Sequence, residues 1–257
     1  MGFVLAIVIG VVLGLIGGGG SILAVPVLVY VMDVSPIQAT AYSLFIVGFS
    51  ALVGARNHYK LGNIDFKIGT LFAIPSFIGV FVSRRWLLPA IPDNLSETTS
   101  FVLTKDVFLM LLFAAIMLLA SFSMLFKKEQ SQQLKEIQKV KIIADGLIVG
   151  VVTGLVGAGG GFLIVPALVF LSGLEIKKAI GTSLMIIAVK SLFGFLGEWG
   201  SEIDWKLLLL FTALSASGIF LGVYLGKFMD GKKLKRSFGF FVLLMAIAII
   251  LKETVWI

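Results

Sequence analysis

A glycine-rich run interrupts an apolar segment twice in this chain. Residues 14–20 read GLIGGGG, and residues 154–161, which begin 140 positions later, read GLVGAGGG. A proline follows each run, Pro26 in the first half and Pro166 in the second. Hydrocarbon tolerates non-helical backbone only where protein or a water-filled cavity covers it. Two matched breaks in two matched halves are typical of a membrane carrier that binds its cargo at the breaks.

The composition indicates that lipid is the solvent for most of the surface. Of 257 residues, 59% are hydrophobic and 14% charged, and the mean hydropathy is +1.09. The chain has no cysteine, which excludes disulfides and thiolate metal sites. The first residues carry neither a charged region nor a cleavage site, so we expect membrane protein from Met1 onward rather than a signal peptide. We attribute the net charge of +7 to loops that face the cytoplasm, not to a nucleic-acid partner.

The sequence predicts an internal duplication. Residues 14–54 align without gaps to residues 154–194 with 16 identities in 41 positions, glycine, proline and serine among them. Convergence on a hydrophobic pattern would not place these residue types together. We therefore divide the chain into a first membrane repeat (1–126), a cytoplasmic linker (127–139) and a second membrane repeat (140–257).

The apolar segments on either side of each glycine run are too short to cross a bilayer alone. A helix rises ~1.5 Å per residue against a hydrocarbon core of ~30 Å. Each pair therefore makes either one broken crossing or a hairpin that enters and leaves on one side. Two further alternatives, a tight hairpin or close helix packing with no binding role, also explain the glycines.

The distribution of lysine and arginine favours hairpins. With broken crossings, the 20 basic residues near segment ends divide evenly between the two sides; with hairpins, 15 lie on one side and 5 on the other. The excess places the linker in the cytoplasm and both termini outside. Three crossings then separate the hairpins, so the two repeats are predicted to be inverted.

We predict an anion-binding site at the glycine runs. Each break begins a new half-helix whose free N–H groups and positive dipole end attract anions. The amides belong to Gly17, Gly18, Gly19, Gly20 and Ser21 in the first repeat and to Gly157, Gly159, Gly160 and Gly161 in the second. The spacing matches neither nucleotide-binding motif, so we expect no cofactor.

Polar side chains in otherwise apolar helices complete the predicted site. Hydroxyl groups can donate to an oxyanion without a charge, and the candidates are Thr40, Ser43, Thr182 and Ser183. Alternatively, they bond back to their own helix. Lys190 is costly in lipid, so it should face a cavity or a partner, where it would compensate an anion; otherwise it snorkels or pairs with Glu198.

Three residues are candidates for coupling transport to a proton or ion: His58, Asp145 and Glu198. Histidine carries a proton near neutral pH, although a solvated loop histidine is the commoner case. No catalytic constellation and no multi-histidine metal site is present, so we expect neither an enzyme nor a metal. The glycines spaced as GxxxG, such as Gly10 and Gly14, are expected to pack helices within the chain rather than to drive dimerisation.

The glycine runs, each followed by Pro and then by Ala-x-x-x-Ser-Leu, resemble the TauE/SafE family of sulfite exporters, also called the toluene-sulfonate uptake permeases. Residues 63–66 (NIDF) and 202–205 (EIDW) resemble that family's post-helix motif. The resemblance covers nearly the whole chain. It implies an inner-membrane permease for sulfite or organosulfonates and carries over the glycines together with Ser43, Thr182 and Ser183. Ala41 and Tyr42 stand where the second repeat has the more typical Gly181 and Thr182, which puts a symmetric use of the two helices in doubt.

The sequence thus predicts an all-α polytopic membrane protein with two inverted repeats, each a glycine-rich pair plus three transmembrane helices. Its expected function is secondary transport of a small sulfur-containing anion by alternating access. A passive anion channel and a non-transporting scaffold are the alternatives. The expected partners are the anion, a co-transported proton or ion, the lipid bilayer and a second copy in a homo-oligomer.

Overall fold

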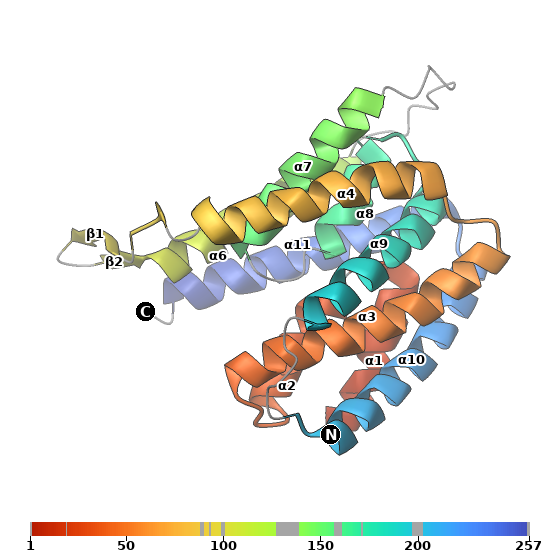
Figure 1. Cartoon of the computed structure of the whole chain (residues 1–257), viewed down its shortest axis with the longest axis horizontal. Coiled ribbons are helices and arrows are strands. Elements are labelled where there is room, and N and C mark those ends of the chain that lie inside the picture. The colour runs from red at the N-terminus through yellow and green to blue at the C-terminus, as the bar shows by residue number, and fades with distance from the viewer. Residues whose placement is uncertain are drawn as a thin grey trace.

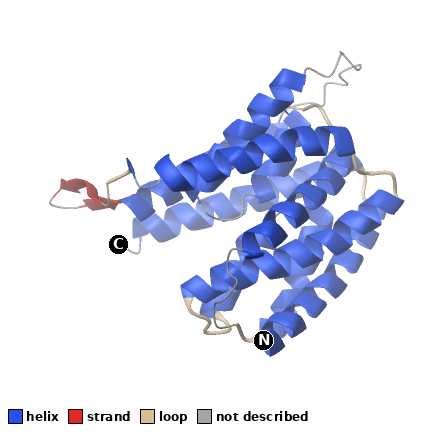
Figure 2. Ribbon diagram, viewed as in Figure 1, coloured by secondary structure: helices blue, strands red, loops and turns tan. Residues whose placement is uncertain are grey.

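The computed structural model describes residues 2–18, 20–87, 90–92, 94–98, 101–126, 139–156, 161–170, 172–196 and 203–255. Most of the predicted linker therefore lies outside the described residues. So do Gly19, Gly157, Gly159, Gly160 and Glu198. The described chain is a bundle of helices (Figures 1 and 2), which confirms the predicted fold class.

Among the described residues of the first half, five α-helices correspond to apolar segments of the sequence. Their bounds are α1 Gly2–Ile16, α2 Gly20–Tyr30, α3 Pro36–Lys60, α4 Phe66–Val82 and α6 Lys105–Phe126. A π-helical turn, η1 Ser83–Leu87, extends α4. The third apolar segment predicted from the sequence covers residues 37–55, whereas α3 continues to Lys60, because Arg56 and Lys60 form helix well although they are polar.

The second half repeats this order. Its helices are α7 Lys139–Val156, α8 Gly161–Phe170, α9 Ile176–Leu196, α10 Trp205–Phe228 and α11 Gly231–Val255. A feature that the sequence did not predict is a short antiparallel hairpin, β1 Asn94–Thr98 with β2 Phe101–Thr104, which precedes α6. It projects from one end of the bundle in Figure 2.

Two matched aspartates fix where the fourth helix of each half begins. The Asp65 carboxylate accepts a hydrogen bond of 2.9 Å from the N–H of Ile68 at the start of α4. The Asp204 carboxylate accepts one of 3.0 Å from Leu207 at the start of α10. An N-cap of this kind satisfies one of the helix's free donors.

The chain reverses direction at the first glycine run. Gly17 adopts φ +75°, a left-handed conformation that favours glycine. A Cβ atom on Gly2, at the start of α1, would collide with the sulfur atom of Met32, which follows α2. The start of α1 and the end of α2 therefore lie side by side, so this pair forms a hairpin rather than one broken crossing (Figure 1).

The first helix of each half packs against the fourth helix of the other half. Helix α1 packs along α10, and the corresponding pair in the other half, α7 and α4, packs in the same way. Helices α3 and α9, α6 and α11, and α2 and α8 each contact their own counterpart. The main helix pairs are therefore unchanged when the two halves are exchanged. Helices α1, α2, α3 and α10 contact one another and lie together in the lower part of Figure 1.

Glycines allow the exchanged helices to touch backbone to backbone. A Cβ on Gly14 of α1 would lie 2.6 Å from the carbonyl oxygen of Ile219 in α10, and one on Gly218 would collide with that of Ile7. In the matching pair, a Cβ on Gly150 of α7 would collide with the carbonyl oxygen of Ser76 in α4. Packing within the chain is thus confirmed for these GxxxG glycines.

The outer surface has the character of a surface that faces lipid. Four of the described helical segments are long and apolar enough to cross a membrane: Phe66–Leu87, Ile176–Leu196, Trp205–Phe228 and Gly231–Leu251. Large apolar side chains such as Phe77, Phe81, Phe220 and Leu221 are exposed along α4 and α10. Water penalises an apolar surface of this extent, whereas the acyl chains of a bilayer do not.

Candidate functional site

The first glycine run makes a tight turn that only glycine fits. Gly17 donates its N–H to the carbonyl oxygen of Leu13 at 2.8 Å, which closes the last turn of α1. A Cβ at Gly17 would lie 2.8 Å from the Ser183 hydroxyl and 2.9 Å from the Cα of Ile180. Gly18 follows in a buried position, and Gly20 and Ser21 form the first turn of α2. The predicted reversal before α2 is therefore built against α9.

Ser183 holds this turn in place. Its buried hydroxyl lies 2.7 Å from the carbonyl oxygen of Gly17 and 2.8 Å from that of Ile180, its own helix neighbour. A hydroxyl has a single proton, so its donor is committed to these carbonyls, while its lone pairs can still accept. The structure thus places Ser183 at the first run, where it anchors the backbone. Measured from the start of α9, Ile180 and Ser183 lie ~6–10 Å along the helix, short of its middle.

Tyr42 and Thr182 occupy equivalent positions in the repeat alignment but differ in residue type, and they make equivalent hydrogen bonds in the structure. The Thr182 hydroxyl accepts a hydrogen bond of 3.0 Å from the N–H of Asp65. The Tyr42 hydroxyl accepts one of 2.7 Å from the N–H of Asp204. Each joins the third helix of one half to the N-cap before the fourth helix of the other. The departure at Tyr42 therefore preserves the cross-half contact.

The other predicted hydroxyls lie in α3. Ser43 is buried there, at the position that corresponds to Ser183. Thr40 is in the first turns of α3, and its side chain lies outside the described part. Ser50, the counterpart of Lys190, is buried and 3.0 Å from the Ser215 hydroxyl of α10. The α3 face therefore carries polar contacts to the opposite half as well.

Lys190 extends from α9 to the last turn of α7. Its ammonium group donates to the Thr153 hydroxyl of α7 at 3.1 Å. Thr153 is buried and precedes Gly157 by one helical turn, while Gly161 begins α8 after the run. The lysine is half-buried, and its partner Thr153 lies four residues before Gly157 of the second glycine run in the sequence. The predicted pairing with Glu198 lies outside the described residues.

Asp145 is a second buried ionisable group on α7. It is 7% exposed, and its Oδ2 atom has no hydrogen-bond partner among the described residues. Eight residues separate it from Thr153, which corresponds to ~12 Å along the helix. Asp145 and Thr153 thus lie on the same helix, α7, separated by this distance along its axis.

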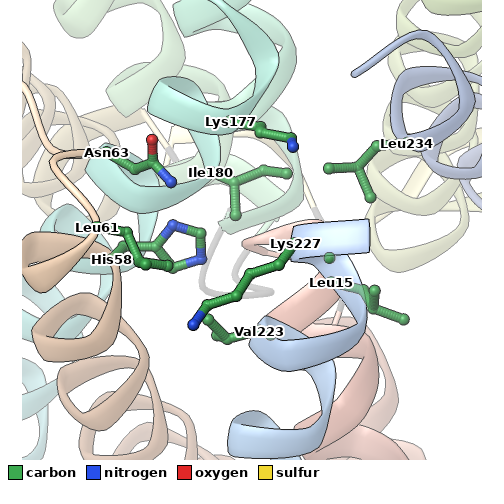
Figure 3. A pocket seen from close by; sticks show the side chains of 11 residues that line it. Leu15, His58, Leu61, Asn63, Lys177, Ile180, Val223, Lys227 and Leu234 are labelled. Atoms are coloured by element: carbon green, nitrogen blue, oxygen red, sulfur yellow. The ribbon is translucent and has the colours of Figure 1, made fainter. Parts of the chain in front are cut away.

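His58 lines a cavity at the end of the molecule where α9 begins. The cavity has a volume of about 250 Å³. His58, Asn63, Lys177 and Lys227 supply its polar lining, and Leu15, Leu61, Ile180, Val223 and Leu234 its apolar side chains. Figure 3 shows His58, Lys177 and Lys227 around this opening. Ile180 connects the cavity to the first glycine run, because it packs against Gly17, and Leu15 precedes Gly17 by two residues.

His58 is not a solvated loop residue, the commoner case for a single histidine. It is 6% exposed, and neither ring nitrogen has a hydrogen-bond partner in the described part of the chain. Leaving a buried donor unsatisfied costs about 1–3 kcal/mol. The sequence singled out His58 but not Lys177 and Lys227, which entered only the charge distribution. Nothing in their local sequence brings α9 and α10 to α3, so only the fold could reveal the cluster.

Within the described residues, no three histidine, cysteine or acidic side chains gather as a metal site would require. The chemistry that the described groups offer is therefore hydrogen bonding and positive charge. Backbone amides, hydroxyls, two cavity lysines and Lys190 provide it.

Known proteins are similar to this chain over nearly its whole length. The family described as "Sulfite exporter TauE/SafE" matches residues 2–249. A probable membrane transporter protein of Xylella fastidiosa strain 9a5c is 31% identical over 94% of this chain and 91% of its own length. One from Bacillus subtilis strain 168 is 28% identical over 98% and 96%, and one from Haemophilus influenzae is 26% identical over 95% and 94%.

No solved structure matches the chain. The relatives are transporters by name, which agrees with the absence of a catalytic constellation from the sequence. The family match, the apolar exterior and the helical bundle together confirm a multi-pass integral membrane protein that is not an enzyme. The chain belongs to the TauE/SafE sulfite exporter family of membrane transporters.

Proposed function

We propose that this transporter is a secondary permease for small sulfur-containing anions such as sulfite or organosulfonates. The observation that carries the proposal is the first glycine run, whose turn is anchored to α9 by Ser183 and borders a cavity with two lysines. A helix that starts at such a turn directs N–H groups toward its N-terminal end, where an anion is stabilised. The family description supplies the sulfur chemistry.

The roles divide among the site residues. The amides of Gly18, Gly19, Gly20 and Ser21 in one half, and of Gly157, Gly159, Gly160 and Gly161 in the other, coordinate the anion. Gly17, whose N–H is bonded to the Leu13 carbonyl, shapes the turn that presents them. Ser183 holds the first turn, and Ser43 is proposed to hold the second. Thr40 and Thr182 line the approach. Lys190 supplies positive charge beside the second run through its contact with Thr153.

Alternating access follows from the proposed inversion of the two repeats. The contact pattern supports it, because exchanging the halves leaves the main helix pairs unchanged. The moving units are then mixed: α1, α2, α3 and α10 in one, and α7, α8, α9 and α4 in the other. They would rock across the α3–α9 and α2–α8 contacts so that the site opens to each side in turn.

We propose that the protein spans the inner membrane. In the proposed orientation, the end that carries Lys177 and Lys227 faces the cytoplasm. Lys60 and Lys67 flank the loop before α4, and Asn63 of that loop contacts Gly181, so these basic residues share that end. Both termini would lie outside. His58, Asp145 and Glu198 stay proposals for coupling to a proton or ion, and a homo-oligomer stays a prediction.

The experiment is flux of radiolabelled sulfite into proteoliposomes that contain the full chain. A secondary carrier shows uptake that saturates with concentration and is accelerated by unlabelled sulfite on the other side. A passive channel shows flux that does not saturate and no such exchange. A scaffold shows no flux above empty liposomes. Either of the last two results would contradict the proposal.

A further inference from the structure

We propose that the cavity between α3, α9 and α10 binds a small organic anion whose acidic group is a sulfonate or a carboxylate. The inference rests on the proposed transport function, because it makes this cavity the first binding site on the path to the glycine run. It deepens that function by favouring an anion with a short hydrocarbon part over bare sulfite.

The first argument is charge. Lys177 of α9 and Lys227 of α10 bring two ammonium groups to one cavity (Figure 3). The acidic residues nearest to them in the sequence, Glu175 and Asp230, are exposed, and neither forms an ion pair with them among the described residues. An anionic headgroup in the cavity gains a favourable Coulomb interaction with each ammonium group that reaches it.

The second argument is the buried histidine. His58 is shielded from solvent, yet both of its ring nitrogens lack a partner in the part of the chain that the structure describes. A neutral imidazole carries one N–H donor, and a sulfonate or carboxylate oxygen is a suitable acceptor. Asn63 adds an amide to the same lining. His58 and Asn63 thus add uncharged hydrogen-bond donors to the lining.

The third argument is the apolar part of the lining. Leu15, Leu61, Ile180, Val223 and Leu234 contribute hydrocarbon to this lining. Sulfite and sulfate have no apolar surface that could use these contacts. A short alkyl chain gains from leaving water for such a wall. A volume of about 250 Å³ accommodates a ligand of a few carbon atoms.

The cavity also leads to the proposed transport site. Ile180 lines it and at the same time packs against Gly17, where a Cβ would come within 2.9 Å of the Ile180 Cα. Gly14 and Leu15, from the last turn of α1, complete the connection. A single residue, Ile180, therefore separates a ligand in the cavity from the turn that precedes α2.

The test uses the fact that His58 is the only histidine in the chain. The full chain, labelled with ¹⁵N-histidine and placed in phosphatidylcholine nanodiscs, gives imidazole signals from this residue alone. Titration with ethanesulfonate or propionate should shift these signals to saturation, and sulfite should need a higher concentration. Signals that stay fixed while calorimetry shows ethanesulfonate bound would overturn the proposal.

Lysine variants give an independent measurement. Lys177→Met and Lys227→Met should each weaken ethanesulfonate binding roughly tenfold, because each removes a charge-assisted hydrogen bond. Lys178→Met, the neighbouring exposed lysine, is the matched control and should bind like the wild type. Equal affinity in all three variants would contradict the proposal.

A lipid headgroup could supply similar chemistry. If phosphatidylglycerol in the nanodisc shifts the His58 signals by itself and excludes ethanesulfonate, the cavity is a lipid site and the proposal is wrong. The transport function is judged separately by sulfite flux. Fixed His58 signals with intact flux refute the cavity alone, whereas shifted signals with no flux of any sulfur anion support the cavity and refute the permease.

Discussion

The hydroxyl group of Ser183 lies 2.7 Å from the carbonyl oxygen of Gly17, although 166 residues separate them in the sequence. The contact ties the first glycine break, in one half of the chain, to a helix of the other half. It shows that the break is a defined turn with a fixed neighbour. The geometry of the proposed site and the stability of the fold are therefore expected to depend on the same hydrogen bond.

Replacing Ser183 by alanine should lower stability and weaken transport together. The loss of one buried hydrogen bond costs about 0.5–1.5 kcal/mol, and it leaves the Gly17 carbonyl free to move. We expect a lower thermal midpoint in detergent and a higher KM for sulfite flux. Ser217→Ala removes an exposed hydroxyl that bonds only to its own helix, so it should change neither quantity. A Ser183→Ala variant with normal KM would reject the positioning role.

Gly17→Ala should destabilise the protein more than Gly62→Ala. Both glycines have positive φ, +75° and +70°, so alanine pays about 1–2 kcal/mol of left-handed strain at either position. Only Gly17 is also crowded, since no atom lies within 4 Å of a Cβ placed at Gly62. Overpacking should add about 1–3 kcal/mol at Gly17. Equal losses in thermal denaturation would show that the turn is not packed against α9.

Tyr42→Phe should cost stability because Asp204 loses the acceptor of its N–H, by about 1 kcal/mol. Thr182→Val should have a comparable effect through Asp65, as the equivalence of the two contacts requires. Tyr59→Phe is the control, since the Tyr59 side chain is 61% exposed. If Tyr42→Phe unfolds at the wild-type temperature while Thr182→Val does not, the two contacts are not equivalent.

Lys190→Met should reduce sulfite flux at low substrate concentration roughly tenfold, because it removes a charge-assisted interaction beside the second glycine run. The contact with Thr153 would be lost as well, so folding is checked by size-exclusion chromatography. Lys206→Met, at the exposed start of α10, should transport normally. Unchanged flux in Lys190→Met would remove the lysine from the site.

The local sequence predicted those features that depend on residue type and spacing. The hairpin at the first run follows from its glycines and from the distribution of basic residues along the whole chain. The packing of Gly14 and Gly218 follows from the spacing of small residues, which is a local cause. The N-caps Asp65 and Asp204 stand in the matched motifs, but only the structure shows their capping role.

The remaining features depend on contacts between distant segments. The alignment made Tyr42 look like a departure, because a phenol and a threonine hydroxyl differ in size yet reach equivalent N–H groups. The β1–β2 hairpin lies in a polar stretch without a strong alternation. His58, Lys177 and Lys227 come from three helices, so no spacing rule could have joined them. The mixed helix groups likewise follow from packing alone.

The most direct test of anion binding at the glycine break is chemical labelling of a single cysteine. The chain contains no cysteine, so Ser21→Cys, in the first turn of α2, introduces the only reactive thiol. Ser217→Cys, on an exposed face of the membrane-spanning α10, should react slowly with a water-soluble maleimide under all conditions. Our account predicts that Cys at position 21 reacts measurably and that saturating sulfite or ethanesulfonate slows the reaction several-fold. A labelling rate that does not change, at an anion concentration that saturates transport, would contradict binding at the break.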